Sequence, residues 1–361
     1  MAGELMKAWR LERLGGDLSL QDIPVPEVRP GSVLVRIQAA SLLSYLKQYV
    51  RGELPQYLAP KRPFTLGTNG VGEIAAVGRD VWHLKSGQRV VISPHLVARE
   101  NVANPEQILI ALTSMTPSAE QMLEDWSDGT LAEYALLPAS AVTPAEGLDH
   151  IAAPQLATSA RYVVPFGGLL RGRLSAGETL IVTGATGAFG TAAVLLGVAL
   201  GAGRVVAAGR NITALDSVVH AAGPRVTPVA LKGDVQADAR ALREAAGGGA
   251  HIAFDMVGRA RDPNATLAAL HSLNRGGRLV LMGSMTTELP LPYGLVMANN
   301  LEILGQFMYP ADAFRQLLGL VRTGLLDLTR LRPKVYPLAA LPEAMDAAAN
   351  AGNLQSVVIQ P

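Results

Sequence analysis

The chain has 361 residues, more than one compact domain usually contains, so we expect two domains. Its formal net charge of +1 excludes an overall electrostatic attraction to nucleic acid or to an anionic membrane. The absence of cysteine excludes disulfides, thiolate zinc sites, iron–sulfur clusters and cysteine nucleophiles, and it fits a cytoplasmic protein.

Short alternating strands with Gly and Pro between them predict a β-rich domain over residues 1–155. The segments are SVLVRIQAAS, VGEIAAVG, QRVVISP and LAEYALLPA. Residues 95–128 interrupt this pattern, because NPEQILIALTSMTPSAEQMLEDWSDG has helical spacing and a candidate cap at Asn104 and Pro105. We therefore expect a helical insertion there.

Uniformly apolar strands alternate with helical segments over residues 156–324. The strands are ETLIVTG, RVVAAGR, HIAFDMVG, RLVLMGS and LEILGQF, and this pattern predicts an α/β domain with a doubly wound parallel sheet. Residues 179–203 carry no charge, but their glycines favour a buried strand, a turn and a helix over a membrane span. The remaining residues, 325–361, contain a strand, a helix in LPEAMDAAANAG and a last strand in SVVIQ.

The stretch VTGATGAFG places three glycines between a buried strand and a helix. In such a turn, glycine lets backbone N–H groups approach a pyrophosphate, and the start of the helix adds partial positive charge. The alternative is a tight strand–helix junction that binds nothing. We expect cofactor contacts from Gly184, Thr186, Gly187, Ala188, Phe189 and Gly190.

The end of the next strand, RVVAAGRN, bears on the choice of cofactor. NAD enzymes usually have an acidic residue there, which hydrogen-bonds the ribose hydroxyl. Here Gly209 leaves room for a phosphate, Arg210 can form paired hydrogen bonds with it, and Asn211 follows. This pattern predicts NADPH; alternatively, Arg210 is a solvated charge at the end of a strand.

A second glycine-rich stretch, TLGTNGVGE, precedes strands and no helix. There is no helix start to receive a phosphate, so we do not expect Gly67, Gly70 and Gly72 to bind one.

The motifs LGTNGVGEIAAVG, GQRVVIS, GTLAEYALLP, GETLIVTGATGAFG, HIAFDMVG and GGRLVLMGS resemble, in this order, the medium-chain dehydrogenases and reductases. The resemblance covers nearly the whole chain. It implies a GroES-like catalytic domain, made of residues 1–155 and 325–361, around a Rossmann domain, with the nicotinamide in the cleft between them. It also implies a homodimer through the edge of the Rossmann sheet, with LEILGQF as the edge strand, and no nucleic-acid or membrane partner.

Zinc members of this family have Gly-His-Glu where this chain has Gly67, Thr68 and Asn69. Their catalytic cysteine falls near Leu43 and their third ligand near Gln155, which is a loose alignment. Neither Leu43 nor Thr68 replaces those ligands, and the chain's histidines show no paired ligand spacing (His83, His95, His150, His220, His251 and His271). The resemblance is therefore to the zinc-free branch, and we expect no metal.

Without zinc, hydride transfer favours a small-molecule substrate that is already electrophilic, so we expect an NADPH-dependent reductase of an activated C=C bond in an enoyl thioester, enone or quinone. A zinc-free alcohol or aldehyde oxidoreductase and a non-catalytic NADPH-binding relative remain alternatives. Tyr45 is the first candidate proton donor, Tyr57 the second and Tyr49 the third, unless these tyrosines only pack. Leu43, Thr68 and Asn69 would line the substrate pocket; alternatively, Thr68 and Asn69 only form a turn.

Further cofactor contacts follow from the family resemblance and from the carboxyl ends of the Rossmann strands, where ligands bind. Asp255, by contrast, is expected to fix a loop rather than to contact substrate. The expected contacts are Val257, Gly258, Gly283, Ser284 and Phe307.

Overall fold

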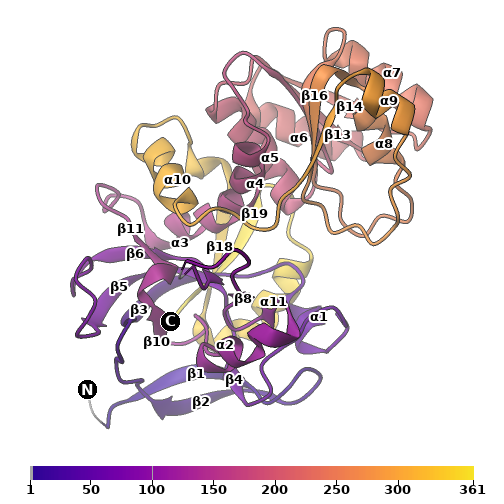
Figure 1. Cartoon of the computed structure of the whole chain (residues 1–361). Coiled ribbons are helices and arrows are strands. Elements are labelled where there is room, and N and C mark those ends of the chain that lie inside the picture. Colours follow the sequence, from indigo (N-terminus) through magenta and orange to yellow (C-terminus); the bar gives the residue numbers. More distant parts are fainter. Residues whose placement is uncertain (1–2, 100) are drawn as a thin grey trace. The chain divides into compact units, whose positions relative to one another are not determined.

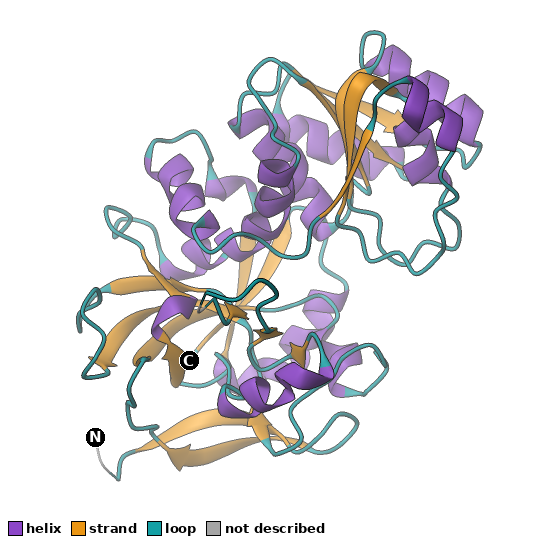
Figure 2. Cartoon of the chain, viewed as in Figure 1, coloured by secondary structure: helices purple, strands orange, loops and turns teal. Residues whose placement is uncertain are grey.

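The computed structural model describes residues 3–99 and 101–361 and divides into two compact units. The first unit runs to Ala160 and takes in Leu331–Ala351 and Gln355–Pro361 from the end of the chain. The second unit comprises Arg161–Arg330 and Gly352–Leu354. Strands dominate the first unit, whereas helices flank a sheet in the second (Figure 1, Figure 2).

The main sheet of the first unit runs in the order β11-β6-β5-β3-β19-β18, with β10 also paired to β3. All of its pairs are antiparallel except that of β18 with β19. The C-terminal strand joins the N-terminal segment here, because Val358 pairs with Ser41. The strands are β3 (Ser32–Ser41), β5 (Asn69–Val77), β6 (Arg89–Ile92), β10 (Tyr134–Pro138), β11 (Val142–Pro144), β18 (Arg332–Pro337) and β19 (Gln355–Gln360).

A second antiparallel sheet, β2-β1-β4, packs part of the N-terminal core. Met6, Ala8, Val25, Leu34 and Ala132 form a buried cluster from β1, β3 and neighbouring loops. The remaining elements of this unit are β1 (Leu5–Leu11), β2 (Leu18–Pro24), β4 (Phe64–Thr65), α1 (Leu46–Val50), α3 (Ala153–Ala157), α11 (Leu341–Ala349) and the 3-10 turns Ala139–Ala141 and Leu338–Ala340.

The expected helical insertion at 95–128 is wrong over most of its length. The segment begins with an antiparallel sheet of β7 (His95–Val97), β8 (Gln107–Leu109) and β9 (Thr113–Ser114). Only Pro117–Ala119 and α2 (Glu120–Asp125) are helical. The physical reason lies in the pairing of β8 with both neighbours, which satisfies its backbone groups without a helix.

The sheet of the second unit is parallel and runs in the order β14-β13-β12-β15-β16-β17. This arrangement confirms the expected doubly wound α/β domain and places the LEILGQF strand, β17, at an edge. The strands are β12 (Thr179–Thr183), β13 (Arg204–Gly209), β14 (Val226–Ala230), β15 (Ala250–Asp255), β16 (Leu273–Leu281) and β17 (Glu302–Gly305). The helices are α4 (Ser159–Arg171), α5 (Ala188–Ala199), α6 (Ile212–Ala222), α7 (Val235–Ala245), α8 (Asn264–His271), α9 (Tyr293–Ala298), α10 (Ala313–Arg322) and the 3-10 turn Leu328–Arg330.

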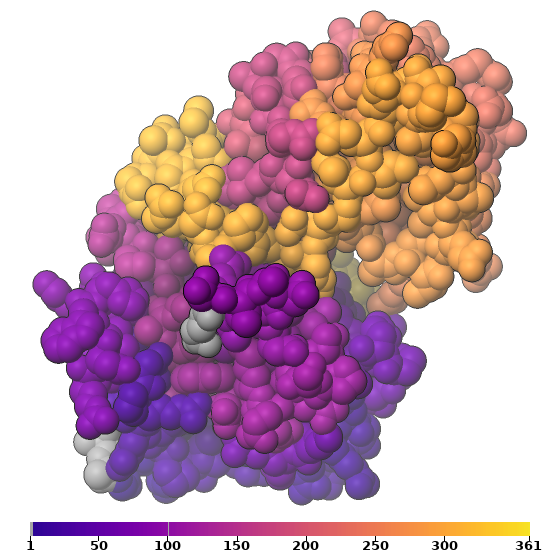
Figure 3. All heavy atoms as spheres, viewed as in Figure 1, coloured from indigo at the N-terminus to yellow at the C-terminus, as the bar shows by residue number. Residues whose placement is uncertain are grey.

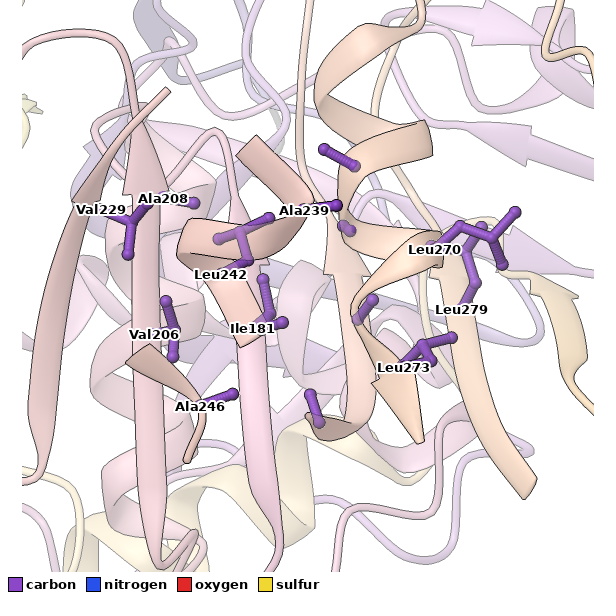
Figure 4. Packing of buried hydrophobic residues seen from close by; sticks show 14 of the residues in the cluster. Ile181, Val206, Ala208, Val229, Ala239, Leu242, Ala246, Leu270, Leu273 and Leu279 are labelled. Carbon is purple, nitrogen blue, oxygen red and sulfur yellow. The ribbon is translucent and has the colours of Figure 1, made fainter. Parts of the chain in front are cut away.

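Both faces of this sheet are covered, which explains its uniformly apolar strands. On one face, Ile181, Val206 and Leu279 pack against Leu242 of α7 and Leu270 of α8 (Figure 4). On the other face, glycines bring helices close. A Cβ on Gly197 of α5 would lie 2.7 Å from the Leu180 side chain, and one on Gly168 of α4 would lie 2.4 Å from that of Phe254.

In the described part of the chain, no helix is long and apolar enough to cross a membrane. The uncharged stretch of residues 179–203 folds instead as β12, a turn and α5, as expected.

Candidate functional site

The turn between β12 and α5 is built on two glycines that admit no side chain. Gly184 has a φ of +65°, and a Cβ there would lie 2.7 Å from the Met256 carbonyl oxygen. A Cβ on Gly190, in the first turn of α5, would lie 2.1 Å from the Gly184 carbonyl oxygen. The start of the helix is therefore pressed directly against the turn, as a dinucleotide site requires.

Gly187 differs, because a Cβ there would meet a single atom and no side chain. It caps α5, which has no side-chain cap and no acidic residue in its first turn. A Cβ on Gly187 would meet only the Gly184 carbonyl oxygen, at 3.3 Å. The first N–H groups of the helix thus face space that an anion can enter, and the residues fit a pyrophosphate there.

The carboxyl ends of β15 and β16 meet beside this turn. A Cβ on Gly283 would lie 2.3 Å from the Val257 carbonyl oxygen, and one on Gly258 would lie 3.0 Å from the Ser284 hydroxyl oxygen. The four predicted contact residues are therefore neighbours at the edge of the sheet where ligands bind. Phe307, the fifth, is 42% exposed.

Asp255 holds this edge together, in the role expected of it. Its Oδ1 accepts hydrogen bonds from the hydroxyls of Thr183 at 2.7 Å and Thr266 at 3.2 Å, and from the Val257 amide at 3.4 Å. Burial raises the pKa of the Asp255 carboxyl, and these hydrogen bonds partly oppose that effect. The carboxylate binds strand ends rather than facing open space.

The end of β13 lies next to the glycine turn, since a Cβ on Gly209 would come within 3.4 Å of the Thr186 side chain. Arg210 is exposed, so its guanidinium is available to a ligand. Asn211 is already used: it caps α6, and its Oδ1 accepts a hydrogen bond from the Ala214 amide at 3.1 Å. Arg210 is therefore the better candidate for a charged contact.

In the first unit, Leu43 and Thr68 line one small cavity. Its volume is about 10 Å³, close to that of a single water-sized sphere. Asn69 is buried behind Thr68 and donates from Nδ2 to the Thr68 hydroxyl oxygen at 2.9 Å. The lining contains no charged side chain: Ser41, Leu42, Leu43, Leu46, Tyr49, Leu66, Gly67, Thr68, Ala111 and Leu112.

The three candidate tyrosines form one cluster. The Tyr57 ring contacts that of Tyr45, with centroids 5.9 Å apart, and that of Tyr49, with centroids 5.5 Å apart. Tyr45 is the N-cap residue of α1 and Tyr49 lies four residues later, so the start of the helix places them one turn apart. Tyr49 is the member that lines the cavity, but its hydroxyl already donates to the Leu112 carbonyl oxygen at 2.7 Å.

Burial makes these tyrosines weak acids. It raises the pKa of Tyr45 well above its ordinary value, and the neighbouring Tyr57 raises it further. Burial also raises the pKa of Tyr57, while a hydrogen bond from Tyr45 lowers it. Both side chains are neutral at physiological pH and can donate hydrogen bonds.

A catalytic zinc does not fit this donor set. Leu43 offers no ligand atom, and Thr68 offers a neutral hydroxyl. Gln155 is not part of the cavity lining; its amide donates to the Leu331 carbonyl oxygen at 3.0 Å. Across residues 3–99 and 101–361, no group of three or more His, Cys, Asp or Glu side chains is placed to hold a metal ion.

Sequence reasoning missed how these residues connect. The hydrogen bond from Asn69 to Thr68 depends on the side-chain conformations of the two residues, which the sequence pattern does not specify. The hydrogen bond from Tyr49 to Leu112 joins two segments that lie far apart in the sequence. The spacing of Tyr45 and Tyr49 was a usable signal for the cluster, but it required knowing that α1 is a helix.

Two family models match the chain, an "alcohol dehydrogenase GroES-like domain" at residues 29–147 and a "zinc-binding dehydrogenase" at residues 188–323. Sorbitol dehydrogenase of Bacillus subtilis is 25% identical and aligns over 92% of this chain and 90% of its own. An NAD-dependent alcohol dehydrogenase of Sulfurisphaera tokodaii is 26% identical over 98% of both chains.

The fold is also shared with a solved structure, the cobalt- and zinc-bound thermostable alcohol dehydrogenase of Pyrobaculum aerophilum. It has a TM-score of 0.75 and 22% identity, and the match covers 99% of this chain and 100% of that one. Together with the glycine turn and the GroES-like and Rossmann units, these matches show that the chain is an oxidoreductase of the medium-chain dehydrogenase/reductase superfamily.

Proposed function

We propose that this protein is a zinc-independent, nicotinamide-dependent oxidoreductase that interconverts an alcohol and its carbonyl compound. The observation that carries the proposal is the cavity of the first unit, in which a neutral hydroxyl replaces a metal ligand in a chain otherwise similar to alcohol dehydrogenases. This was an alternative at the level of the sequence, and the relatives support it better than the reduction of a C=C bond.

When bound, a nicotinamide cofactor would supply a hydride to the carbonyl carbon or accept one from the alcohol carbon. The chain's part is to hold the pyrophosphate at Gly187 and to keep the first turn of α5 free of acids. In the first unit it supplies the neutral hydroxyl of Thr68 to the oxygen that gains negative charge. The proton that completes the alcohol comes from a tyrosine or from water.

We propose a preference for NADPH, because Gly209 and the exposed Arg210 stand where a carboxylate would select NADH. The relative from Sulfurisphaera tokodaii is named as NAD-dependent, so the preference needs a direct test. We expect Arg210→Ala to weaken NADPH binding and leave NADH binding unchanged, measured by quenching of protein fluorescence. Equal effects on both cofactors would refute the assignment.

A second candidate is the reduction of an activated C=C bond. The observation in its favour is that the cavity and the tyrosine cluster offer only neutral donors of ordinary or raised pKa. Weak donors suffice when the charge left by the hydride spreads over a conjugated system. An enone, quinone or enoyl thioester would meet this condition without a metal.

One panel separates these candidates. The absorbance of NADPH at 340 nm would be followed with simple aldehydes and ketones, enones, quinones and enoyl-CoA thioesters. Turnover of simple carbonyls, unaffected by dialysis against a chelator, supports the proposal. Turnover of conjugated substrates alone favours the second candidate. Tight NADPH binding without turnover of any substrate indicates a non-catalytic relative.

We also propose that the protein forms a homodimer through the edge of the Rossmann sheet. β17 is an edge strand, and α9, which precedes it in the chain, exposes Tyr293 (81%) and Met297 (60%). The orange segment that contains α9 lies on the surface of the second unit (Figure 3). We expect Tyr293→Asp with Met297→Asp to yield monomers by light scattering, whereas Trp82→Asp, an equally exposed site in the first unit, leaves the mass unchanged.

A further inference from the structure

We infer that the hydroxyl of Thr68 donates a hydrogen bond to the oxygen of an apolar carbonyl substrate, and that Asn69 fixes the direction of this donor. The inference rests on the proposed function and names both a catalytic residue and a substrate class for the same cavity.

The direction of the Thr68 hydroxyl follows from its partner. Asn69 donates from Nδ2 to the Thr68 oxygen at 2.9 Å, which uses one acceptor position and leaves the hydroxyl proton free. Within the described residues, that proton has no acceptor. Since Thr68 lines the cavity, the cavity is where its proton can find an acceptor.

The surrounding backbone holds this pair in place. The Thr130 hydroxyl donates to the Asn69 carbonyl oxygen at 3.0 Å. Just before Thr68, Gly67 has a φ of +105°, and a Cβ on Gly129 would lie 1.8 Å from the Gly67 carbonyl oxygen. The chain therefore crosses itself here with no room for side chains, so Thr68 cannot shift without displacing a second segment.

The size of the cavity matches a single oxygen atom. Its volume of about 10 Å³ accepts one water-sized group. Besides Thr68, its lining consists of leucines, Gly67, Ala111, the Tyr49 ring and Ser41, whose hydroxyl donates to the Ala157 carbonyl oxygen at 2.7 Å. The Tyr49 hydroxyl is bound to Leu112 and does not compete for the occupant. A carbonyl oxygen could take this place and accept the hydrogen bond from Thr68.

The Thr68 hydrogen bond would polarise the carbonyl group of the substrate, as a zinc ion does in zinc-dependent alcohol dehydrogenases, but more weakly. As the hydride forms the new C–H bond, the π electron pair moves to the carbonyl oxygen, and the Thr68 hydrogen bond becomes stronger with the growing charge. The hydride transfer would oxidise the cofactor and reduce the carbonyl carbon, and the alkoxide would then take a proton from water or a tyrosine.

The same walls select against polyols. The cavity accepts one oxygen only, and its mostly apolar lining offers no partner to a second hydroxyl of a sugar alcohol. We therefore expect an aliphatic aldehyde or ketone with a single oxygen to be preferred over sorbitol and fructose.

The direct test compares Thr68→Val, which keeps the shape and removes the hydroxyl, with Thr68→Ser, which keeps the hydroxyl. We expect Thr68→Val to lower kcat with an aliphatic aldehyde by about 100-fold, while NADPH affinity is unchanged and Thr68→Ser retains most activity. Thr158→Val is the matched control, a buried threonine of the same unit that lies outside the cavity and bonds the Gln155 carbonyl oxygen.

Asn69→Asp gives a sharper test of orientation. A carboxylate would accept from Thr68 and turn its proton away from the cavity, so this variant should lose activity although Thr68 is intact. Thermal denaturation of each variant shows that it is folded. Wild-type rates in folded Thr68→Val and Asn69→Asp would overturn the inference.

A readout independent of turnover uses isobutyramide, an unreactive carbonyl probe, bound together with NADPH. We expect its C=O stretch in infrared difference spectra to shift to lower frequency in the wild type and in Thr68→Ser, but not in Thr68→Val. The same shift in all three would overturn the role of Thr68. If the wild type reduces no carbonyl compound and yet shows the Thr68-dependent shift, the proposed function fails and the oxygen site stands.

Discussion

Two substitutions in the glycine turn between β12 and α5 should affect cofactor binding and thermal stability to different extents. Gly190→Ala would place a Cβ 2.1 Å from the Gly184 carbonyl oxygen, so backbone must move by about 1 Å to reach a tolerable contact. Overpacking of this kind costs about 1–3 kcal/mol. In a unit of this size, each kcal/mol lowers Tm by about 2–4 °C. Gly190→Ala should therefore lower Tm by about 2–12 °C as well as weaken cofactor binding.

Gly187→Ala should behave differently. Its φ of −78° suits alanine, and its Cβ would meet only the Gly184 carbonyl oxygen, at 3.3 Å, a tight contact that a backbone shift of a few tenths of an ångström relieves. The gain from a less flexible unfolded chain, about 0.4–1 kcal/mol, offsets the poorer helix cap, so Tm should stay nearly constant. The added methyl group nevertheless occupies space that the pyrophosphate needs.

The assays are thermal denaturation without ligand and fluorescence titration with NADPH. We expect Gly187→Ala to weaken NADPH binding at least 10-fold with an unchanged Tm. If this variant binds NADPH as tightly as the wild type, no phosphate approaches the start of α5 and the cofactor site is misplaced. If Gly190→Ala keeps the wild-type Tm, the close packing of the turn is wrong.

Two further predictions concern residues that support the sites. Because burial raises the pKa of Asp255, the native state holds its proton more tightly than the unfolded state, so stability falls as pH rises through the native pKa. The Tm of Asp255→Asn relative to wild type should therefore increase as the pH rises above about 4, the ordinary pKa of an aspartate, and a constant difference would contradict this. The Thr113 hydroxyl oxygen accepts a hydrogen bond from the Leu58 amide at 2.8 Å, next to Tyr57 in the chain. Thr113→Val should therefore lower the free energy of unfolding, measured by chemical denaturation, by about 1 kcal/mol, whereas Thr113→Ser should not. Equal stabilities of the two variants would count against this hydrogen bond.

The fold was largely predictable because its strongest signals are local. Uniformly apolar runs such as TLIV and RVVAAG can only be buried on both faces, and they are β12 and β13 of a covered sheet. The prediction of a helix over residues 107–114 was wrong because the local signal there is ambiguous. Their apolar spacing suits a helix or a strand, and the turn between β8 and β9 depends on Ala111 at φ +58°, a conformation that alanine does not signal.

The sequence predicted which residues form the candidate sites, but not which hydrogen bonds and segments connect them. Leu43 and Thr68 were both expected in one pocket, and they line one cavity. The cavity is closed by Ala111 and Leu112, which belong to the segment that was predicted as a helix. Asn211 was expected to contact the cofactor, but its side chain caps α6, a use that depends on where that helix begins.

The two glycine-rich stretches show what distinguishes a ligand site from a tight backbone. Crowding around a glycine does not distinguish them. A Cβ on Gly67 would lie 2.6 Å from the Leu131 amide nitrogen, and one on Gly184 would lie 2.7 Å from the Met256 carbonyl oxygen. The difference is a glycine at the start of a helix, Gly187, whose Cβ would meet only one atom. A Cβ on Gly70 or Gly72 would strike a carbonyl oxygen of β3, at 2.9 Å and 2.4 Å, whereas Gly187 faces space beside the free N–H groups of α5. Glycine leaves room for backbone in the first stretch, and we propose that it leaves room for a pyrophosphate in the second, so substitution at Gly187 alone should change binding without changing the fold.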